Sequence, residues 1–131
     1  MFANYVYNDA NRSEKGKLGN VNIGDGYKFI GRGIFQLTGR TNYTNFNTFY
    51  QENYDITIDL LENPELVASD KKIAVISALW FFKNNVLDEL SQTLDSNTTC
   101  LSVSKLVNGG TNGLTHRTAL LTSTQINIDC L

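Results

Sequence analysis

The 131-residue sequence has few of the side chains that build metal centres: one histidine and two cysteines, with no C-x-x-C pair. Because a structural zinc site needs about four such ligands, we predict no metal site, and we find no motif for a cofactor. Cys100 and Cys130 leave two interpretations open. They are separate thiols, or they form a disulfide that ties the C-terminus to the body, which requires an oxidising compartment.

Charged residues are also scarce, at 18% of the sequence with a net charge of −2. Nucleic-acid binding depends on clustered Lys and Arg side chains that neutralise phosphates. The only dense basic stretch contains Arg12, Lys15 and Lys17, and Glu14 dilutes it. The sequence therefore argues against nucleic acid as a partner.

Long apolar runs are missing as well. No stretch of about 18 apolar residues occurs, so we expect neither a membrane span nor a membrane partner. The first residues, Met1 to Arg12, are polar and lack the apolar core of a signal peptide. The sequence thus shows no export route, and it is compatible with a piece of a longer protein.

Neutral polar residues are abundant instead: Asn, Thr, Ser, Gln and Tyr occur along the whole chain. Such side chains donate and accept hydrogen bonds without charge, which suits neutral hydroxylated or amide-bearing ligands such as sugars. The same composition is common on ordinary protein surfaces, so composition alone leaves both interpretations open. A chain of this length fits one domain.

Most of the ten glycines lie in residues 1–40. This density predicts turns and loops with short extended pieces rather than long helices. Phe29–Ile30 and Ile34–Phe35 are expected as short strands or as buried loop anchors.

From Thr41 onward the pattern becomes helical, with Tyr43, Phe46 and Phe49 or Tyr50 at helical spacing. Asn63-Pro64-Glu65 predicts a helix start with Asn63 as its cap. Ser69 is expected to cap the next helix, with Asp70 near its positive end.

That helix contains apolar residues from Ile73 to Phe82, spread around much of its circumference. The spread predicts a central buried helix with Trp80 in the core. Thr98 or Thr99 is expected to cap a further helix that Gly109-Gly110 ends, and Thr115 is expected to cap the last one. The sequence therefore predicts a mainly α fold.

The densest segment runs from Gly24 to Tyr43. Gly31 and Gly33 begin like the phosphate-binding G-x-G-x-x-G loop, but Gln36 replaces the third glycine and no buried strand precedes it, so we predict no nucleotide site. Alternation along an extended chain would turn Gln36 and Thr38 to one side and Leu37 into the core. The polar groups then either contact a ligand or satisfy loop backbone.

The same segment, Gly-Asp-Gly-Tyr at 24–27 followed by Gly-Arg-Gly-Ile-Phe-Gln-Leu-Thr-Gly-Arg-Thr-Asn-Tyr at 31–43, resembles the signature of glycoside hydrolase family 19. This family includes plant-type chitinases and bacterial or phage lysozyme-like endolysins. Further stretches resemble it in the same order: residues 5–7, 19–20, 63–66, 78–82 and 108–113 with Arg117. The resemblance implies a lysozyme-like helical fold. Residues 1–131 would form a single partial catalytic domain, with a Gly-rich loop or short β region in 1–40 and helices in 41–131.

The resemblance also implies roles for individual residues. Gln36 would hydrogen-bond the sugar or its acetamido group, and Thr38 would help to hold the attacking water. The other expected site residues are Asn42 beside the cleaved sugar, Asn108 on the opposite wall, Tyr27 along the cleft and Arg117 in a charged network behind the catalytic carboxylates.

Glycosidic cleavage with inversion needs an acid and a base about 6.5–9.5 Å apart. The family's acid is a Glu that follows a His, and this sequence contains no His-Glu pair. His116 is expected at the surface or just behind the site rather than as a catalyst, and we expect the general acid on a segment upstream of this sequence. Glu14 is a weak candidate base because its basic neighbours favour the ionised carboxylate; the alternative is a solvated loop residue. Asp25 is expected in a turn.

Two main hypotheses follow. The first is an endo-acting glycosidase of the chitinase or lysozyme type. It would act as a monomer, without a cofactor, on extracellular or cell-wall polymers of β-1,4-linked N-acetylglucosamine, with peptidoglycan slightly favoured over chitin. The second is a non-catalytic glycan-binding remnant of the same family, and a purely structural remnant is a third possibility.

Overall fold

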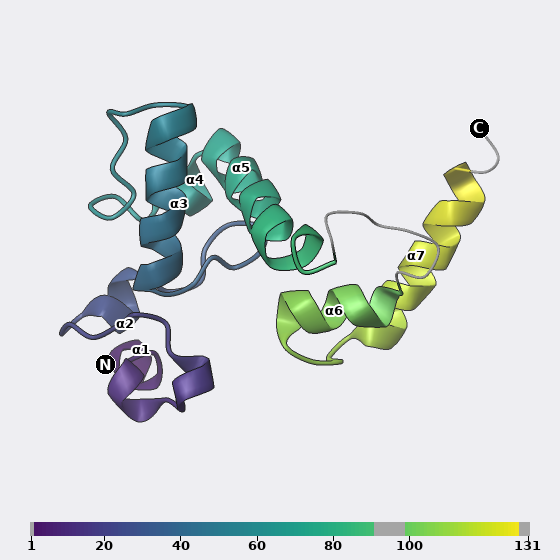
Figure 1. Cartoon of the computed structure of the whole chain (residues 1–131), viewed down its shortest axis with the longest axis horizontal. Coiled ribbons are helices and arrows are strands. Elements are labelled where there is room, and N and C mark those ends of the chain that lie inside the picture. Colours follow the sequence, from purple (N-terminus) through teal and green to yellow (C-terminus); the bar gives the residue numbers. More distant parts are fainter. Residues whose placement is uncertain (1, 91–98, 129–131) are drawn as a thin grey trace. The chain divides into compact units, whose positions relative to one another are not determined.

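Helices form the regular secondary structure of the computed structural model, which describes residues 2–90 and 99–128 (Figure 1). The chain divides into two units, Met1–Phe81 and Phe82–Leu131, and each is described here by itself. The described residues contain no strand, only an isolated antiparallel bridge between Arg32 and Leu37. The predicted mainly α fold is confirmed.

The Gly-rich N-terminal region folds into short helical turns. They are α1 (Phe2–Val6), η1 (Asp9–Asn11), η2 (Glu14–Gly16) and α2 (Asp25–Lys28). The expected short strands are therefore wrong. Phe29 is fully buried and acts as the loop anchor that was the alternative, whereas Ile34 is 60% exposed.

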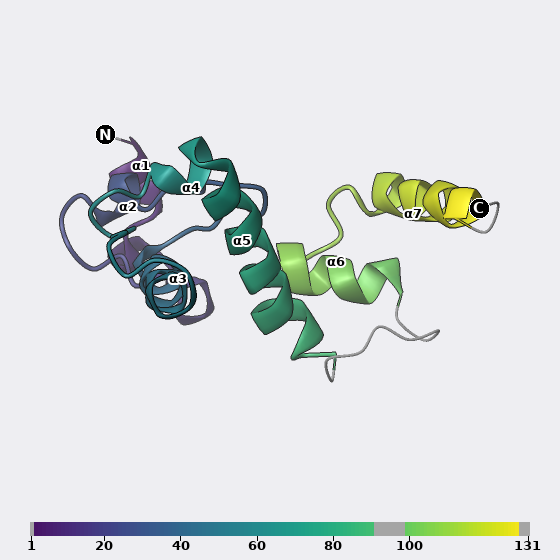
Figure 2. The same ribbon diagram turned by 90° about the horizontal axis from the view of Figure 1, so that it is seen from above.

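The first unit is built around α3 (Arg40–Asn53), which is seen nearly end-on in Figure 2. Tyr43, Phe46 and Tyr50 recur on one side of this helix and are buried, as their spacing predicts. They join a core cluster with residues before and after the helix. The other members are Phe29, Leu37, Leu60, Val67 and Ile73.

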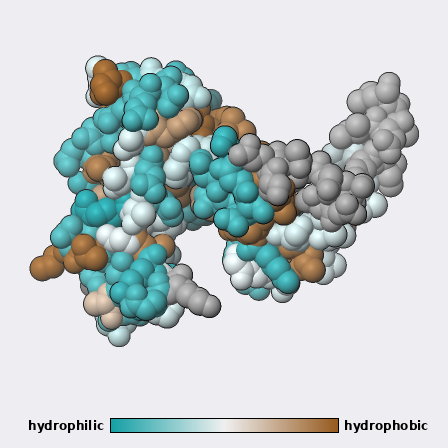
Figure 3. Space-filling view, viewed as in Figure 1, coloured by the Kyte–Doolittle hydropathy of each residue, from teal (hydrophilic) through white to brown (hydrophobic). Residues whose placement is uncertain are grey.

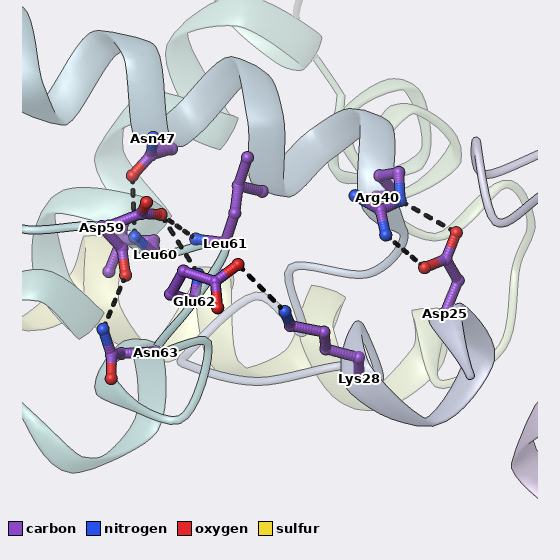
Figure 4. Close-up of polar contacts among 9 residues, drawn as sticks. All are labelled: Asp25, Lys28, Arg40, Asn47, Asp59, Leu60, Leu61, Glu62 and Asn63. Atoms are coloured by element: carbon purple, nitrogen blue, oxygen red, sulfur yellow. Dashed lines mark hydrogen bonds and ion pairs between the residues drawn. The ribbon is translucent and has the colours of Figure 1, made fainter. Parts of the chain in front are cut away.

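A long loop after α3 is held by side-chain oxygens that accept backbone N–H groups (Figure 4). Asn47 Oδ1 accepts from Leu60 N at 2.8 Å, and Asp59 Oδ1 accepts from Leu61 N at 2.8 Å. These bonds let the loop place Leu60 in the core although the segment forms no regular structure.

Two predicted helix starts are displaced. Helix α4 (Leu66–Ser69) is short, and Asn63 does not cap it, because its Nδ2 donates to the carbonyl of Asp59 at 3.2 Å. Helix α5 (Lys71–Phe82) is capped by Asp70, whose Oδ1 accepts from Ile73 N at 3.0 Å. The predicted Ser69 cap is wrong; the Ser69 hydroxyl donates to Glu65 O.

Helix α5 lies on the side of the core rather than at its centre. Ile73, Ser77 and Ala78 are buried, but Val75 and Leu79 are 48% and 66% exposed. The prediction of a central buried helix is therefore wrong. Trp80 does pack on the core, with its ring 5.5 Å from that of Phe46.

The second unit contains η3 (Lys83–Leu87), α6 (Cys100–Asn108) and α7 (Leu114–Ile128). Thr99 caps α6 in a reciprocal capping box with Ser102, and Gly109 ends the helix in the left-handed conformation, both as predicted. The predicted Thr115 cap is wrong, because α7 already begins at Leu114. Thr98 and Cys130 lie outside the described residues, so the Cys100–Cys130 pairing stays untested.

The surface is mixed in polarity, and hydrophobic atoms project from the turn before α2 and from the loop after α3 (Figure 3). Val21, Ile23 and Ile56 are the apolar residues exposed there, at 72%, 104% and 73%. Over residues 2–90 and 99–128, no helix has both the length and the hydropathy needed to cross a membrane.

Candidate functional site

The residues predicted to bind ligand begin in a tight turn between Arg32 and Leu37, called here the Gln36 turn (residues 32–37). Arg32 and Leu37 exchange two backbone hydrogen bonds of 3.2 and 2.8 Å, and Gln36 N donates to Gly33 O at 3.3 Å. Gln36 itself has a φ of 55°, a left-handed conformation rare for a side-chain-bearing residue. The turn points Leu37 into the core and leaves Gln36 exposed.

Gln36 and Thr38 lie on the same side of the chain, over Gly31. A Cβ atom at Gly31 would stand only 2.6 Å from Gln36 Oε1 and 2.9 Å from Thr38 Oγ1. Gly31 therefore provides the room in which the two polar side chains meet. They share a face as the alternation predicts, although the backbone is a turn and not a strand; we call this pair the polar face.

Two of the polar side chains near the turn already donate hydrogen bonds to backbone carbonyls. Thr38 Oγ1 donates to Gln36 O at 2.5 Å, and Asn42 Nδ2 donates to Thr38 O at 2.8 Å. The loop-satisfying alternative thus holds for these two donors. The Thr38 hydroxyl keeps its acceptor capacity, and the Asn42 Oδ1 is the remaining acceptor of that amide.

The turn is packed tightly against α4 and α5. Gly33 has a φ of 73°, and a Cβ there would lie 3.1 Å from Val67 O and 3.2 Å from Ser77 Oγ. Any side chain at Gly33 would therefore meet both a strained backbone and a crowded site. Packing, rather than approach to a ligand, explains this glycine.

A buried tyrosine and an arginine hold the turn from the inside. Arg32 Nη1 donates to Lys28 O at 2.8 Å and to Tyr43 Oη at 3.1 Å, and the Tyr43 hydroxyl donates to Ile30 O at 3.2 Å. Burial raises the pKa of Tyr43 despite the opposing hydrogen bond from Arg32. Tyr43 therefore stays a neutral donor throughout the physiological range.

Asp25 is not a simple turn residue, so that expectation is wrong. It is 2% exposed and forms a two-bond ion pair with Arg40, with Nε donating to Oδ2 at 2.8 Å and Nη2 donating to Oδ1 (Figure 4). Burial alone would raise the pKa of Asp25, but the hydrogen bonds from Arg40 and Asn22 outweigh it and lower the pKa. Nothing in the local sequence pattern separates this Asp from an ordinary turn residue.

The second unit contains a separate polar cluster around Arg117 on α7. Arg117 Nε donates to the buried Ser104 Oγ at 2.9 Å, and Nη2 donates to Asn112 O at 2.6 Å. With its amide turned so that Oδ1 faces the guanidinium, Asn108 accepts from Nη1 and Nη2 at 3.0 and 3.1 Å. Among the described residues the hydrogen-bond partners of Arg117 are neutral, and the charged network behind the catalytic carboxylates stays a prediction.

This orientation decides the chemistry that Asn108 offers. Because Oδ1 then accepts from the guanidinium, the other group of the amide is the Nδ2 donor. Asn108 is exposed, so the donor is available to an acceptor such as a carbonyl or hydroxyl oxygen.

Comparison with known protein families identifies the family of this chain. The sequence model of the chitinase class I family, glycoside hydrolase family 19, matches residues 3–93. The chain belongs to glycoside hydrolase family 19. The resemblance in the Gln36 turn and in α5 is thereby confirmed.

Three similar proteins illustrate how far the resemblance extends. A glycosyl hydrolase family 19 domain-containing protein of Haemophilus influenzae is 34% identical over 113 residues, 85% of this chain and 49% of that protein. An acidic endochitinase of Petunia hybrida is 38% identical over 60 residues, and inactive chitinase-like protein 1 of Hevea brasiliensis is 40% identical over 57. The matches cover 46% and 44% of this chain and 20% and 16% of those proteins, so the chain spans half or less of these relatives.

The other residues considered in the sequence analysis, Tyr27, Glu14 and His116, lie at the surface. The Tyr27 side chain is 64% exposed on α2, and its backbone N–H donates to Asn4 Oδ1 at 2.7 Å. The Glu14 side chain is 86% exposed and its carboxylate lies 2.7 Å from Lys17 Nζ. The Glu14 position favours the solvated alternative. His116 is exposed on α7, as expected.

Asp9 has a structural role: it is 7% exposed, and its two oxygens accept from Leu18 N and Gly19 N at 2.8 Å each. In residues 2–90 and 99–128, no cluster of three or more His, Cys, Asp or Glu side chains has the geometry to hold a metal ion.

Proposed function

We propose that this chain is part of an inverting glycoside hydrolase domain that acts on polymers of β-1,4-linked N-acetylglucosamine, either peptidoglycan or chitin. It would be an endo-acting enzyme domain, monomeric and without a cofactor, working on extracellular or cell-wall glycan. The observation that carries the proposal is the polar face of Gln36 and Thr38 over Gly31 in a family 19 chain.

The polar face fits the chemistry of an aminosugar. The Gln36 side chain is exposed and carries both an amide donor and an acceptor, which match an acetamido group. The Thr38 hydroxyl keeps its acceptor capacity while it donates to Gln36 O, and a water that donates to it would be held beside the sugar. We assign Gln36 and Asn42 to substrate binding and Thr38 to the positioning of water.

Asn108 and Tyr27 are further proposed substrate contacts, and Arg117 is proposed to support Asn108. Asn108 would donate from Nδ2 to a sugar oxygen, because Arg117 fixes its Oδ1. The role of Arg117 would then be indirect, since its guanidinium already serves Ser104, Asn112 and Asn108. Tyr27, exposed on α2, would line the cleft.

The general acid is the part of the reaction that this chain does not supply in our proposal. Inversion needs one protonated carboxyl group and one carboxylate on opposite faces of the sugar. Arg40 and Asn22 donate hydrogen bonds to the Asp25 carboxylate, which disfavours its protonated form, and both Asp9 oxygens already accept backbone N–H groups. Glu14 is solvated and remains the weak candidate base. We therefore assign the acid to a part of the domain upstream of this sequence.

Two observations favour the alternative of a chain that binds glycan without hydrolysing it. The structural roles of Asp9 and Asp25, together with the similarity to a Hevea protein named as an inactive chitinase-like protein, suit binding without hydrolysis. This alternative keeps the polar face and Asn108 as binding groups and differs only in the absence of turnover.

The test combines turnover and binding by the chain. Release of reducing ends from chito-oligosaccharides and clearing of bacterial cell walls measure turnover, and isothermal titration with chitotetraose measures binding. We expect binding that weakens in Gln36→Ala, and turnover about 10²–10⁴-fold below that of a complete enzyme because a general acid is missing. Undiminished turnover would contradict the assignment of the acid, and no binding would contradict the function itself.

Comparing the two polymers sharpens the substrate. Clearing of peptidoglycan without cleavage of chitin by a chain extended upstream would assign the enzyme to cell-wall catabolism, which we favour slightly. The reverse result would make it a chitinase.

A further inference from the structure

Arg40 lies between two proposed binding residues, Thr38 and Asn42, but its side chain turns away from them. It reaches Asp25 on α2 through the two bonds described above, while Asp25 is almost fully buried. Paired N–H donors of a guanidinium on a carboxylate fix both distance and orientation. The ion pair therefore ties the first residue of α3 to α2 (Figure 4).

The backbone of Arg40 is fixed as well. Its N–H donates to Asn20 Oδ1 at 2.8 Å, and Asn20 is fully buried. The guanidinium carbon also lies 4.7 Å from the centre of the Phe29 ring, while Gly39 N donates to Phe29 O at 2.9 Å. Gly39, at the N-cap of α3, supplies no side-chain cap, so these contacts take over the anchoring of the helix start.

The start of α3 is connected to the polar face by hydrogen bonds. Asn42 Nδ2 donates to Thr38 O, and Thr38 Oγ1 donates to Gln36 O. A displacement of Arg40 would therefore pass on one side to Asn42 and on the other to Thr38 and Gln36.

We propose that Asp25 and Arg40 are positioning residues that hold Gln36, Thr38 and Asn42 in the arrangement that binds the glycan. The proposal rests on the proposed function. It differs from a merely structural role, since a structural pair would change the free energy of unfolding and leave the affinity of the folded protein unaltered.

A second ion pair on α2 provides a matched control. Lys28 Nζ lies 3.5 Å from Glu62 Oε1, and the two side chains are 38% and 73% exposed. Exposed pairs of this kind contribute little, and Lys28 does not anchor the start of α3. Lys28→Met removes one cation from the same short helix without touching Arg40.

The test uses the full chain and the variants Arg40→Lys, Asp25→Asn and Lys28→Met. Chitotetraose affinity is measured by titration calorimetry. Hydrogen exchange is followed at two backbone amides that precede α3, those of Leu37 and Gly39. Tyr54 N, which donates to Tyr50 O at the far end of α3, serves as the internal reference.

We expect Arg40→Lys and Asp25→Asn to weaken binding about tenfold, the equivalent of one charge-assisted hydrogen bond. Exchange at Leu37 and Gly39 should quicken while exchange at Tyr54 does not, and Lys28→Met should change neither affinity nor exchange. If Asp25→Asn does not fold, Arg40→Lys alone tests the proposal, because lysine keeps the positive charge and loses only the paired N–H donors of the guanidinium.

Two results would overturn the proposal. One is unchanged exchange at Leu37 and Gly39 in folded Arg40→Lys; the other is quickened exchange with unchanged affinity. Failure of the unaltered chain to bind chitotetraose is a different outcome. It would overturn the proposed function, and the binding role of the pair with it.

Discussion

The Gln36 turn in the first unit and the polar cluster around Arg117 in the second both contain a side-chain amide, that of Gln36 and that of Asn108. The two regions are held in different ways. The turn packs on Val67 and Ser77, and the start of α3 that follows it is held by the buried Asp25 and Asn20. Asn108 is exposed and is held by one guanidinium, and the glycine that follows it has open space around it. The turn is therefore fixed by the core, whereas the cluster depends on a few surface bonds.

Two of the positive-φ glycines, one in each unit, test this comparison with the largest expected difference in stability. We expect Gly33→Val to cost about 4 kcal/mol, because strain of about 1–3 kcal/mol adds to overpacking of about 1–3 kcal/mol. Gly109→Val, with a φ of 68° and no atom within 4 Å of the new Cβ, should cost only about 1–2 kcal/mol. Urea unfolding followed by circular dichroism measures both, and equal losses would contradict the contrast.

Apolar side chains of the two units should differ in the same sense. Trp80→Ala is expected to cost about 3 kcal/mol, since its ring packs on Phe46. Leu120→Ala on α7, where the side chain is 52% exposed, should change the free energy of unfolding by less than about 0.5 kcal/mol. A marginal effect at Trp80 would instead make this residue a surface or ligand contact.

Acid should loosen the first unit through Asp25. Its pKa in the folded protein lies below the ordinary value of 3.8, so its stabilising contribution is complete above pH 3.8 and is lost as pH falls through the folded-state pKa. Unfolding midpoints measured between pH 6 and pH 3 should show a smaller acid-induced loss in Asp25→Asn. As a control, Asp55→Asn alters a carboxylate whose pKa is lowered by hydrogen bonds from Thr57 but that forms no bond with Arg40. Identical acid profiles for Asp25→Asn and the unaltered chain would contradict this role.

A local effect of modest size is expected at the start of α6. Thr99 accepts from Ser102 N at 3.2 Å in the capping box, and Thr99→Ala should cost about 1 kcal/mol. Thr99→Ser keeps the hydroxyl and is expected to cost much less. The thermal midpoints of the two variants test the cap, and an equal loss in both would show that the hydroxyl bond contributes nothing.

The sequence predicted those elements whose cause is local. Helix α3 follows from the spacing of Tyr43, Phe46 and Tyr50, and α6 follows from the Thr99 cap and Gly109. The Gly-rich region was harder to predict, because glycine permits turns and short helices equally well. Its short helices depend on tertiary bonds, such as the two that Asp9 accepts from Leu18 and Gly19.

The candidate site divides in the same way. The shared face of Gln36 and Thr38 follows from side-chain alternation, and the family resemblance supplied their roles. The Asp25–Arg40 pair joins residues 15 positions apart on two helices, so no local pattern announces it. The orientation of the Asn108 amide depends on Arg117 one helix later, which spacing alone does not fix.

A crystal structure of the chain with bound chitotetraose tests the central claim most directly. The account predicts an acetamido group within hydrogen-bond distance of Gln36 and a water or sugar oxygen beside the Thr38 hydroxyl. An oligosaccharide bound elsewhere on the chain, with Gln36 and Thr38 in contact only with solvent, would contradict it.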